Sequence, residues 1–377
     1  AWVEALIVKR YADRHRMPEE RVCFGLIGAG GVAQALHLPH LARASNIRLK
    51  IVCDQREELV REAQAKWGIP AGVTNAAALF ADPEVQAVVI TTREDAQASL
   101  TIRALEAGKH VYVEKPLAET EAAILDVVQA QQKARRFVAV GFNRRFAPAY
   151  RKAREILRVC GGAKNMHYRI ADPYVHGWGR GYPPGVRMLH ETCHVFDALR
   201  WFAASEAVSV YCAQSRSDEE SLTIRFASGC VASITSSGYA TPDVPKERLE
   251  VFADGGGVTI EEFVQLRTFG RPEYSPVYRF AGHAHPDQDA GHVAAFHERG
   301  EDALYAVRRR AMEDPDAAVP YLNYLVDKGW LAALEHFAES VASGRSPENA
   351  TALDALQAHR LARAAIRSRD TWEVVKL

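Results

Sequence analysis

The amino-acid sequence predicts an α/β protein with an N-terminal doubly wound parallel sheet and a C-terminal α+β domain that contains a large, open, mainly antiparallel sheet. Three observations support this prediction. Residues 22–141 alternate short apolar runs with helical stretches, a pattern typical of parallel sheets covered on both faces. A glycine-rich turn follows the first apolar run, and strand-like segments follow one another directly after about residue 146. At 377 residues the chain exceeds one usual core, so two domains are expected.

In the N-terminal part, short apolar runs predict strands at 22–27, 47–53, 85–91, 110–113 and 137–141, and longer stretches predict helices at 96–107 and 119–135. Gly108 ends the helix at 96–107, because glycine adopts the left-handed conformation just past a helix end. A further helix is predicted to start near Gly31.

The C-terminal part begins with a predicted helix at 148–159. Strands are predicted at 164–170, 208–213, 221–226, 230–236, 249–252, 258–261 and 265–269, and helices at 330–342 and 352–368. Such a sheet has helices on one face and leaves the other for a partner, so we expect a homo-oligomer, a dimer or tetramer, formed through this sheet. We interpret the polar stretch 271–315 as an insertion and residues 1–20 as an added helix or arm.

The turn in the sequence VCFGLIGAGGVA, residues 22–33, has the spacing of a dinucleotide-binding turn. Gly28 permits a tight turn, Gly30 removes the side chain that would block a pyrophosphate, and Ala33 is small enough for the helix to pack close to the sheet. The helix that starts near Gly31 would direct its free N–H groups at the phosphates. A strand-to-helix turn that binds nothing is the alternative interpretation.

An acidic residue follows the second apolar run, as in dinucleotide-binding proteins. Asp54 lies about 20 residues beyond Ala33, where a carboxylate reaches the ribose hydroxyls. Because an acid repels a 2′-phosphate, we predict NAD, with NADP as the alternative cofactor. Arg56 either stacks on the adenine, softening this preference, or is an ordinary surface arginine.

Charge composition argues against two classes of partner. The 47 basic and 47 acidic residues balance, whereas binding to nucleic acid or to anionic membranes favours a basic excess. No apolar run approaches the roughly 20 residues that span a bilayer. The six cysteines are scattered without a Cys-x-x-Cys pair, and residues 1–20 do not have the pattern of a secretory signal, so we expect a cytoplasmic protein.

The strand at 110–113 runs into Glu114-Lys115-Pro116 and so places a lysine at the carboxyl end of the sheet, where open α/β sheets bind ligands. There an ammonium group can stabilise a developing alkoxide. Glu-Lys-Pro is also a common surface tripeptide, and that interpretation stays open.

Four segments together resemble the Gfo/Idh/MocA family of nicotinamide-dependent sugar and cyclitol oxidoreductases: GLIGAGGVA, VVITTREDAQASLTIRALEAGKHVYVEKPLA, VGFNRRFAP and HETCHVFDALRW. The resemblance covers residues 21 to about 270 and again from about 327 to the end. It implies a dinucleotide-binding Rossmann domain at 21–145, a substrate-binding and oligomerisation domain at 146–377, and a site between them. It also implies hydride transfer between NAD(H) and a secondary hydroxyl or ketone of a sugar, cyclitol or sugar derivative.

The resemblance assigns Lys115 as the catalytic lysine and His194 as the general acid or base. His190 occupies the position of the family's usual aspartate, and Glu191 matches a branch that has Glu-x-Cys-His. Two readings follow: His190 assists from the same helix face, or Glu191 orients His194 from three residues away. Asp197 matches the family pattern in a structural or orienting role.

The remaining expected contacts follow the same resemblance. We expect the cofactor to contact Gly28, Gly30, Gly31, Val32, Ala33, Asp54, Gln55, Arg56, Thr91, Thr92, Glu114, Lys115, Asn143 and Arg144. We expect the carbohydrate or polyol substrate to contact Lys115, Asn143, Tyr174, His176, Trp178, His190 and His194. The loop 172–182, which also carries Tyr182, suits a polyhydroxylated ring because aromatic faces stack on sugars. Core packing is the alternative for the aromatic residues. Residues 92–97 lack the proline and histidine that many family members have there.

Three other functions compete with this prediction. The first is a keto-sugar reductase that uses NADPH, and the second is a nucleotide-binding sensor without turnover. The third is a zinc hydrolase, because His190-Glu191-Thr192-Cys193-His194 reads as H-E-x-x-H, although we expect no metal. A second histidine-rich segment has the residue types of metal ligands, although a polar surface loop is the preferred interpretation: His283, His285, Asp287, Asp289, His292 and His297. An anionic substrate group, paired with Arg144, Arg169, Arg180 or Arg187, is also open.

Overall fold

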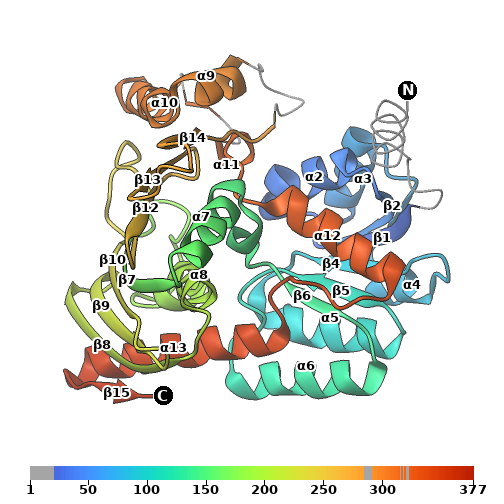
Figure 1. Ribbon diagram of the computed structural model, residues 1–377. Coiled ribbons are helices and arrows are strands. Elements are labelled where there is room, and N and C mark those ends of the chain that lie inside the picture. Colours follow the sequence, from blue (N-terminus) through green and yellow to red (C-terminus); the bar gives the residue numbers. More distant parts are fainter. Residues whose placement is uncertain (1–20, 284–290, 315, 317, 320–321) are drawn as a thin grey trace, which may run out of the picture.

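The computed structural model describes residues 21–283, 291–314, 316, 318–319 and 322–377 (Figure 1). The predicted arm at 1–20 lies outside the described residues. The first domain is a six-stranded parallel sheet in the order β3-β2-β1-β4-β5-β6. Its strands are β1 (Val22–Ile27), β2 (Ile47–Cys53), β3 (Ala71–Val73), β4 (Ala87–Ile90), β5 (His110–Val113) and β6 (Val138–Val140). The predicted doubly wound sheet is confirmed.

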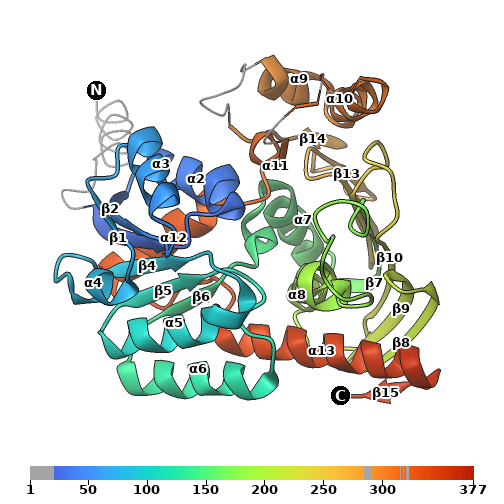
Figure 2. The same ribbon diagram turned by 180° about the vertical axis from the view of Figure 1, so that it is seen from behind.

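Helices cover both faces of this sheet, as Figures 1 and 2 show. They are η1 (Ala33–His37), a π-helical turn that continues into α2 (Leu38–Arg43), then α3 (Glu57–Trp67), α4 (Ala76–Ala81), α5 (Glu94–Glu106) and α6 (Glu121–Ala134). α6 begins after Thr120, whose hydroxyl accepts the N–H of Ala123 at 3.2 Å and so caps the helix. The strands β1, β4 and β6 are buried along their whole length, which explains their continuous apolar sequences.

The second sheet has nine strands in the order β14-β13-β12-β11-β7-β10-β9-β8-β15. They are β7 (Ala163–Ala171), β8 (Ala207–Arg216), β9 (Glu219–Phe226), β10 (Val231–Ser237), β11 (Glu247–Ala253), β12 (Gly256–Glu261), β13 (Gln265–Phe269), β14 (Val277–Arg279) and β15 (Val375–Lys376). Within this second sheet, β7 and β10 are the only parallel neighbours among the described residues. The predicted mainly antiparallel sheet is therefore confirmed. β14 and β15 were not predicted, because three and two residues carry no recognisable alternation.

Helices pack on one face of this sheet. The helical elements that follow β6 along the chain are η2 (Asn143–Phe146), α7 (Pro148–Val159), η3 (Met188–Thr192), α8 (Cys193–Ala203), α9 (Gly291–Arg299), α10 (Glu301–Glu313), α11 (Leu322–Leu325), α12 (Trp330–Ser343) and α13 (Ala352–Thr371). α7, α8 and α13 lie on the covered face (Figure 1). Phe252 and Phe269 are 58% and 54% exposed, on strand positions that alternate with the buried ones.

The polar stretch 271–315 contains β14, α9 and α10, so its described part is structured rather than a surface loop. Glu301, in the first turn of α10, forms an ion pair with Arg267 of β13. α10 therefore docks on the edge of the second sheet.

The chain returns to the first domain near its end. Phe337 of α12 meets Phe24 of β1 edge to face, with ring centroids 6.2 Å apart. α13 starts with a capping box formed by Thr351 and Asp354 and then lies along both domains, beside α6 and beneath the second sheet (Figures 1 and 2). Because α12 packs on the first domain, residues 146–377 do not all lie in the second domain.

Among the described residues, no helix combines the length and apolarity needed to cross a membrane. All six cysteines are buried free thiols, several of them within strands.

Candidate active site

The glycine turn closes tightly on the neighbouring strand. Gly28 has φ of 95°, and a Cβ there would lie 2.9 Å from the backbone of Thr91. By contrast, a Cβ on Gly30 or Gly31 would meet nothing within 4 Å. Ala33 is completely buried where the helix meets the sheet. These features fit a turn that lets a dinucleotide pyrophosphate approach the backbone.

Asp54 lies at this turn, as its spacing predicts. Its Oδ2 accepts the N–H of Ala29 at 2.8 Å and its Oδ1 accepts the N–H of Arg56 at 2.9 Å. The Arg56 side chain is 63% exposed, with Nε 3.8 Å from Oδ1 of Asp54, and Gln55 is exposed beside it. The carboxylate thus holds the glycine turn in place.

A cavity of about 630 Å³ lies between the two domains. Predicted site residues that line it are Gly30, Gly31, Val32, Thr91, Thr92, Glu114, Lys115, Arg144, Trp178, His190, Glu191 and His194. Further lining residues are Leu36, Arg93, Glu94, Gln97, Pro116, Tyr182, Lys246, Asn323, Lys328 and Trp330. The glycine turn and the proposed catalytic side chains therefore face one space.

Lys115 reaches across the domain boundary. Its Nζ donates to the carbonyl oxygen of His190 at 2.7 Å and lies 4.0 Å from Oε2 of Glu191. Beside it, Oε1 of the buried Glu114 contacts Nε2 of His37 in η1 at 2.7 Å. This contact ties the helix after the glycine turn to the strand end that carries the lysine.

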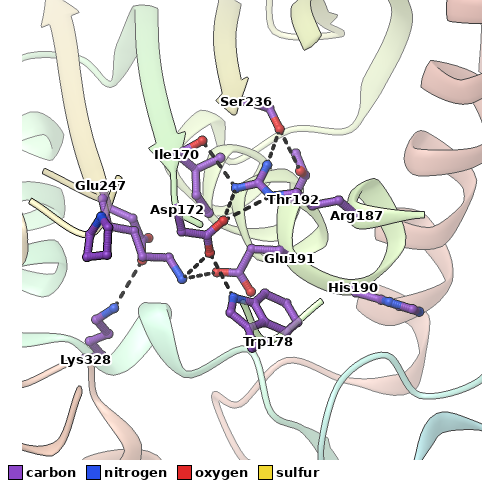
Figure 3. A network of polar contacts seen from close by, with 12 residues as sticks. Ile170, Asp172, Trp178, Arg187, His190, Glu191, Thr192, Ser236, Glu247 and Lys328 are labelled. Carbon is purple, nitrogen blue, oxygen red and sulfur yellow. Dashed lines mark hydrogen bonds and ion pairs between the residues drawn. The ribbon is translucent and has the colours of Figure 1, made fainter. Parts of the chain in front are cut away.

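His190 and Glu191 lie on the π-helical turn η3 and point in different directions (Figure 3). Nε2 of His190 lies 3.5 Å from Oε1 of Glu94, at the start of α5, and its ring packs against Tyr182 with centroids 4.3 Å apart. Burial lowers the pKa of His190 while Glu94 raises it, and the pKa is below the usual histidine value. The acid and the imidazole come from different domains.

Glu191 faces three cations. Its Oε1 lies 2.8 Å from Nζ of Lys246 and 3.8 Å from a guanidinium nitrogen of Arg144. Burial opposes ionisation, but Lys246, Lys115 and Arg144 hold the pKa of Glu191 well below its usual value. The carboxylate is engaged by these cations rather than by His194, so the reading in which Glu191 orients His194 gains no support.

His194 is buried in the cavity wall. Its ring meets Phe142 edge to face at 5.8 Å, and its Nδ1 has no hydrogen-bond partner among the described residues. Burial, together with Arg144 and Lys115, lowers the pKa of His194 well below the usual histidine value. The imidazole is therefore neutral near pH 7 and can accept a proton.

Two lysines that the sequence analysis did not select complete the site. Nζ of Lys246 contacts Asp172 at 2.9 Å as well as Glu191, and Nζ of Lys328 donates to Glu247 at 3.3 Å (Figure 3). Glu247 also accepts two hydrogen bonds from Arg144, each of 2.8 Å. The cavity floor is thus a network of paired buried charges, which fixes Arg144 within the protein.

Several expected contacts lie elsewhere. Asn143 is fully buried and its amide donates to the carbonyl of Lys328 at 2.7 Å, so it supports the loop carrying that lysine and does not line the cavity. Tyr174 is a core residue, 2% exposed, and His176 is exposed against Tyr239. Of the aromatic residues in the loop 172–182 that are expected to suit a sugar ring, Trp178 and Tyr182 line the cavity.

The arginines considered for an anionic substrate group are mostly engaged by the protein. Arg187 is fully buried and binds Asp172 at 3.0 Å, and Arg169 binds Glu261 at 2.8 Å. Arg180 is exposed and donates to the carbonyl of His176. Only Arg144 of these four lines the cavity.

The metal-ligand residue types in the two histidine-rich segments do not gather into one site in the part of the chain that the structure describes. No group of three His, Cys, Asp or Glu side chains that could hold a metal ion occurs among the described residues. His283 packs its ring against Tyr324, whereas His285, Asp287 and Asp289 lie outside the described residues.

The fold and the cavity define an oxidoreductase with an NAD-binding Rossmann domain. The model of the oxidoreductase family GFO_IDH_MocA, described as having an NAD-binding Rossmann fold, matches residues 22–142. This match covers the N-terminal domain of the chain and identifies it as the NAD-binding domain of an NAD(P)-dependent dehydrogenase.

Relatives and solved structures agree with this assignment. Myo-inositol 2-dehydrogenase of Thermotoga maritima is 27% identical over 62% of this chain and 73% of its own length. Inositol 2-dehydrogenase of Gluconacetobacter diazotrophicus is 33% identical over 49% of this chain, and the match spans about half of that enzyme, 55%. The structure of scyllo-inositol dehydrogenase from Lactobacillus casei with NAD(H) and scyllo-inositol has a TM-score of 0.71 at 17% identity, covering 95% of this chain and 99% of that one. This last likeness concerns the fold.

Proposed function

We propose that the protein catalyses reversible hydride transfer between NAD(H) and a secondary hydroxyl or ketone of a sugar, cyclitol or sugar derivative. One observation carries the proposal: a single cavity joins Gly30 and Gly31 of the nucleotide turn to Lys115, His190 and His194. The names of the two inositol dehydrogenases above support a polyhydroxylated substrate.

Bound NAD supplies the hydride acceptor in the oxidation direction, and the chain's own residues manage the proton. The imidazole of His194, which is unprotonated near pH 7, lines the cavity and accepts the hydroxyl proton. The Lys115 ammonium donates a hydrogen bond to the same oxygen and stabilises the alkoxide. His190, paired with Glu94, assists at the edge of the cavity.

A titration of the purified protein with NADH and NADPH by calorimetry tests the cofactor step, with Asp54→Ala alongside. NADH binding that weakens in the variant, followed by NAD-dependent turnover of at least one polyol or sugar, is the expected result. Binding of NADPH alone would favour the keto-sugar reductase. Ligand-dependent behaviour that persists in Lys115→Ala without any turnover would favour the sensor.

We also propose self-association through the open face of the second sheet. Phe252 and Phe269 expose large rings on this face between charged residues such as Arg248 and Glu250. A second copy would remove these rings from water. The six buried free thiols suit a reducing compartment such as the cytoplasm.

A further inference from the structure

We propose that the substrate cleft continues past Trp178 into a second subsite, which binds the second sugar unit of an oligosaccharide or glycosylated cyclitol. The inference rests on the proposed function and specifies its substrate class. A second cavity of about 470 Å³ adjoins the first and also borders the nucleotide turn, and the residues that line both are Gly31, Val32, Leu36, Trp178, Lys246 and Asn323. The two spaces therefore form one continuous cleft.

We assign the second cavity to substrate binding and not to the chemical step. Lys115, His190 and His194 line the first cavity, and none of them lines the second. Each volume falls within the roughly 300–1,000 Å³ of ordinary ligand sites. A ring that reacts beside Lys115 therefore leaves the space beyond Trp178 for an attached unit.

Trp178 stands at the junction with its ring held in place. The indole N–H donates to Oδ2 of Asp172 at 3.2 Å, and Tyr174 packs against the indole edge to face with centroids 4.7 Å apart. Trp178 is nevertheless 48% exposed. A fixed, exposed aromatic face is the group on which sugar rings stack.

The walls beyond Trp178 alternate apolar and polar groups, as the two faces of a sugar require. Ala35, Pro173 and Val244 supply apolar surface, while Thr241 and Arg308 supply hydrogen-bonding groups. Arg308 belongs to α10, in the polar stretch interpreted from sequence as an insertion. That stretch thus builds one wall of the subsite.

The Arg308 guanidinium is anchored on two sides. It donates to Glu262 at 2.9 Å and to the carbonyl of Pro242 at 3.1 Å, whereas its Nε is buried without a hydrogen-bond partner among the described residues. The Nε is enclosed by protein, so the anchored guanidinium forms a fixed polar edge of this wall.

Matched substrate pairs test the subsite: myo-inositol with galactinol, and glucose with maltose and cellobiose, each with NAD. We expect at least one glycoside to exceed its parent in kcat/KM by about tenfold, equivalent to about 1.4 kcal/mol. Val244→Trp, which fills the second cavity, should remove this advantage while turnover of the parent is kept. Leu353→Trp, at a position 53% exposed on α13, is the control and should retain the advantage.

Equal kcat/KM for every parent and glycoside in the wild type, or an advantage that survives Val244→Trp, would overturn the inference. Thr241→Trp replaces Val244→Trp if the latter fails to fold. Calorimetry with the same sugars in the presence of NADH separates the two proposals. Glycoside binding that is lost in Val244→Trp, without turnover of any sugar, would support the subsite and reject the dehydrogenase function.

Discussion

Glu94 and His190 face each other across the domain boundary, with Oε1 and Nε2 3.5 Å apart. The position of the family's usual aspartate carries an imidazole here, and a carboxylate from α5 of the other domain stands beside it. The acid and the histidine are thus brought together by the fold rather than by one helix.

Glu94→Gln should move the acidic limb of the kcat/KM pH profile to lower pH. The reason is that Glu94 raises the pKa of His190 against the effect of burial, so its removal lowers that pKa further. His190→Asn should lower kcat/KM further than Glu94→Gln, because it removes the assisting imidazole itself. Asp95→Asn, at an exposed neighbouring residue, is the control. An unchanged acidic limb in Glu94→Gln would contradict the pairing.

Asp54→Asn should separate the two roles of this carboxylate. Asparagine keeps an oxygen acceptor for the N–H of Ala29 but loses the charge that repels a 2′-phosphate. We expect NADPH to bind more tightly relative to NADH, with little loss of thermal stability. Asp54→Ala should also destabilise the turn, by about 1–3 kcal/mol, because that N–H loses its partner. Equal NADH to NADPH affinity ratios in wild type and Asp54→Asn would speak against a role in cofactor choice.

Glu247→Gln should lower the free energy of unfolding by about 3–5 kcal/mol, measured with urea, because it leaves the buried Arg144 without a full counter-charge. Glu250→Gln, in a partly exposed pair with Arg248, should cost at most about 1 kcal/mol. Burial opposes ionisation of Glu247, but Arg144 and Lys328 hold its pKa below the usual value. Its contribution is therefore present above the unfolded-state pKa of about 4.3 and is lost as the pH falls below that value. Similar losses in both variants would exclude the buried pair as the cause.

Glu220→Gln should stabilise the protein at pH 8 but not at pH 4. Burial raises the pKa of Glu220 to about 7, so folding favours the protonated acid. Stability therefore falls as the pH rises from the unfolded-state pKa toward 7, by up to about 3 kcal/mol. Unfolding of both forms across this pH range measures the effect, and parallel curves would refute it. Glu219→Gln, the preceding and less buried position, serves as the control.

Phe252→Glu should reduce the assembly size measured by light scattering, because a charge replaces a ring that is 58% exposed on the open face of the second sheet. Trp372→Glu, at a ring that is 62% exposed after α13, should leave the assembly size unchanged. A wild-type protein that is monomeric at working concentrations would reject self-association through this sheet.

Local patterns were sufficient for most of the fold. The strand at 110–113, the helix at 148–159 and the strand at 265–269 have the predicted limits, because periodicity and flanking turn residues mark them. The β15 strand was missed since it is a strand only by pairing with β8. The helical pattern of α12 is visible in the sequence, but nothing in its local sequence indicates that the helix packs on β1.

The site residues fall into the same two groups: those that the local sequence indicates and those that only the fold brings to the site. The glycine turn, Asp54 and Lys115 occupy positions fixed by sequence spacing from strand ends. Lys246 and Lys328 reach the cavity from segments distant in sequence, and solitary lysines look like surface residues until the fold surrounds them. Asn143 fell in the expected segment, but its side chain turned toward the backbone of residue 328.

The 20-residue helix α13 is about 30 Å long and packs against both halves of the molecule. Its first turn is anchored where Asp354 meets Arg145 at 2.8 Å, and the preceding Ala350 accepts the N–H of Val140 at 2.7 Å. Because this one continuous helix packs on α6 and on β8, a change in the relative orientation of the two halves would disrupt its contacts with one of them.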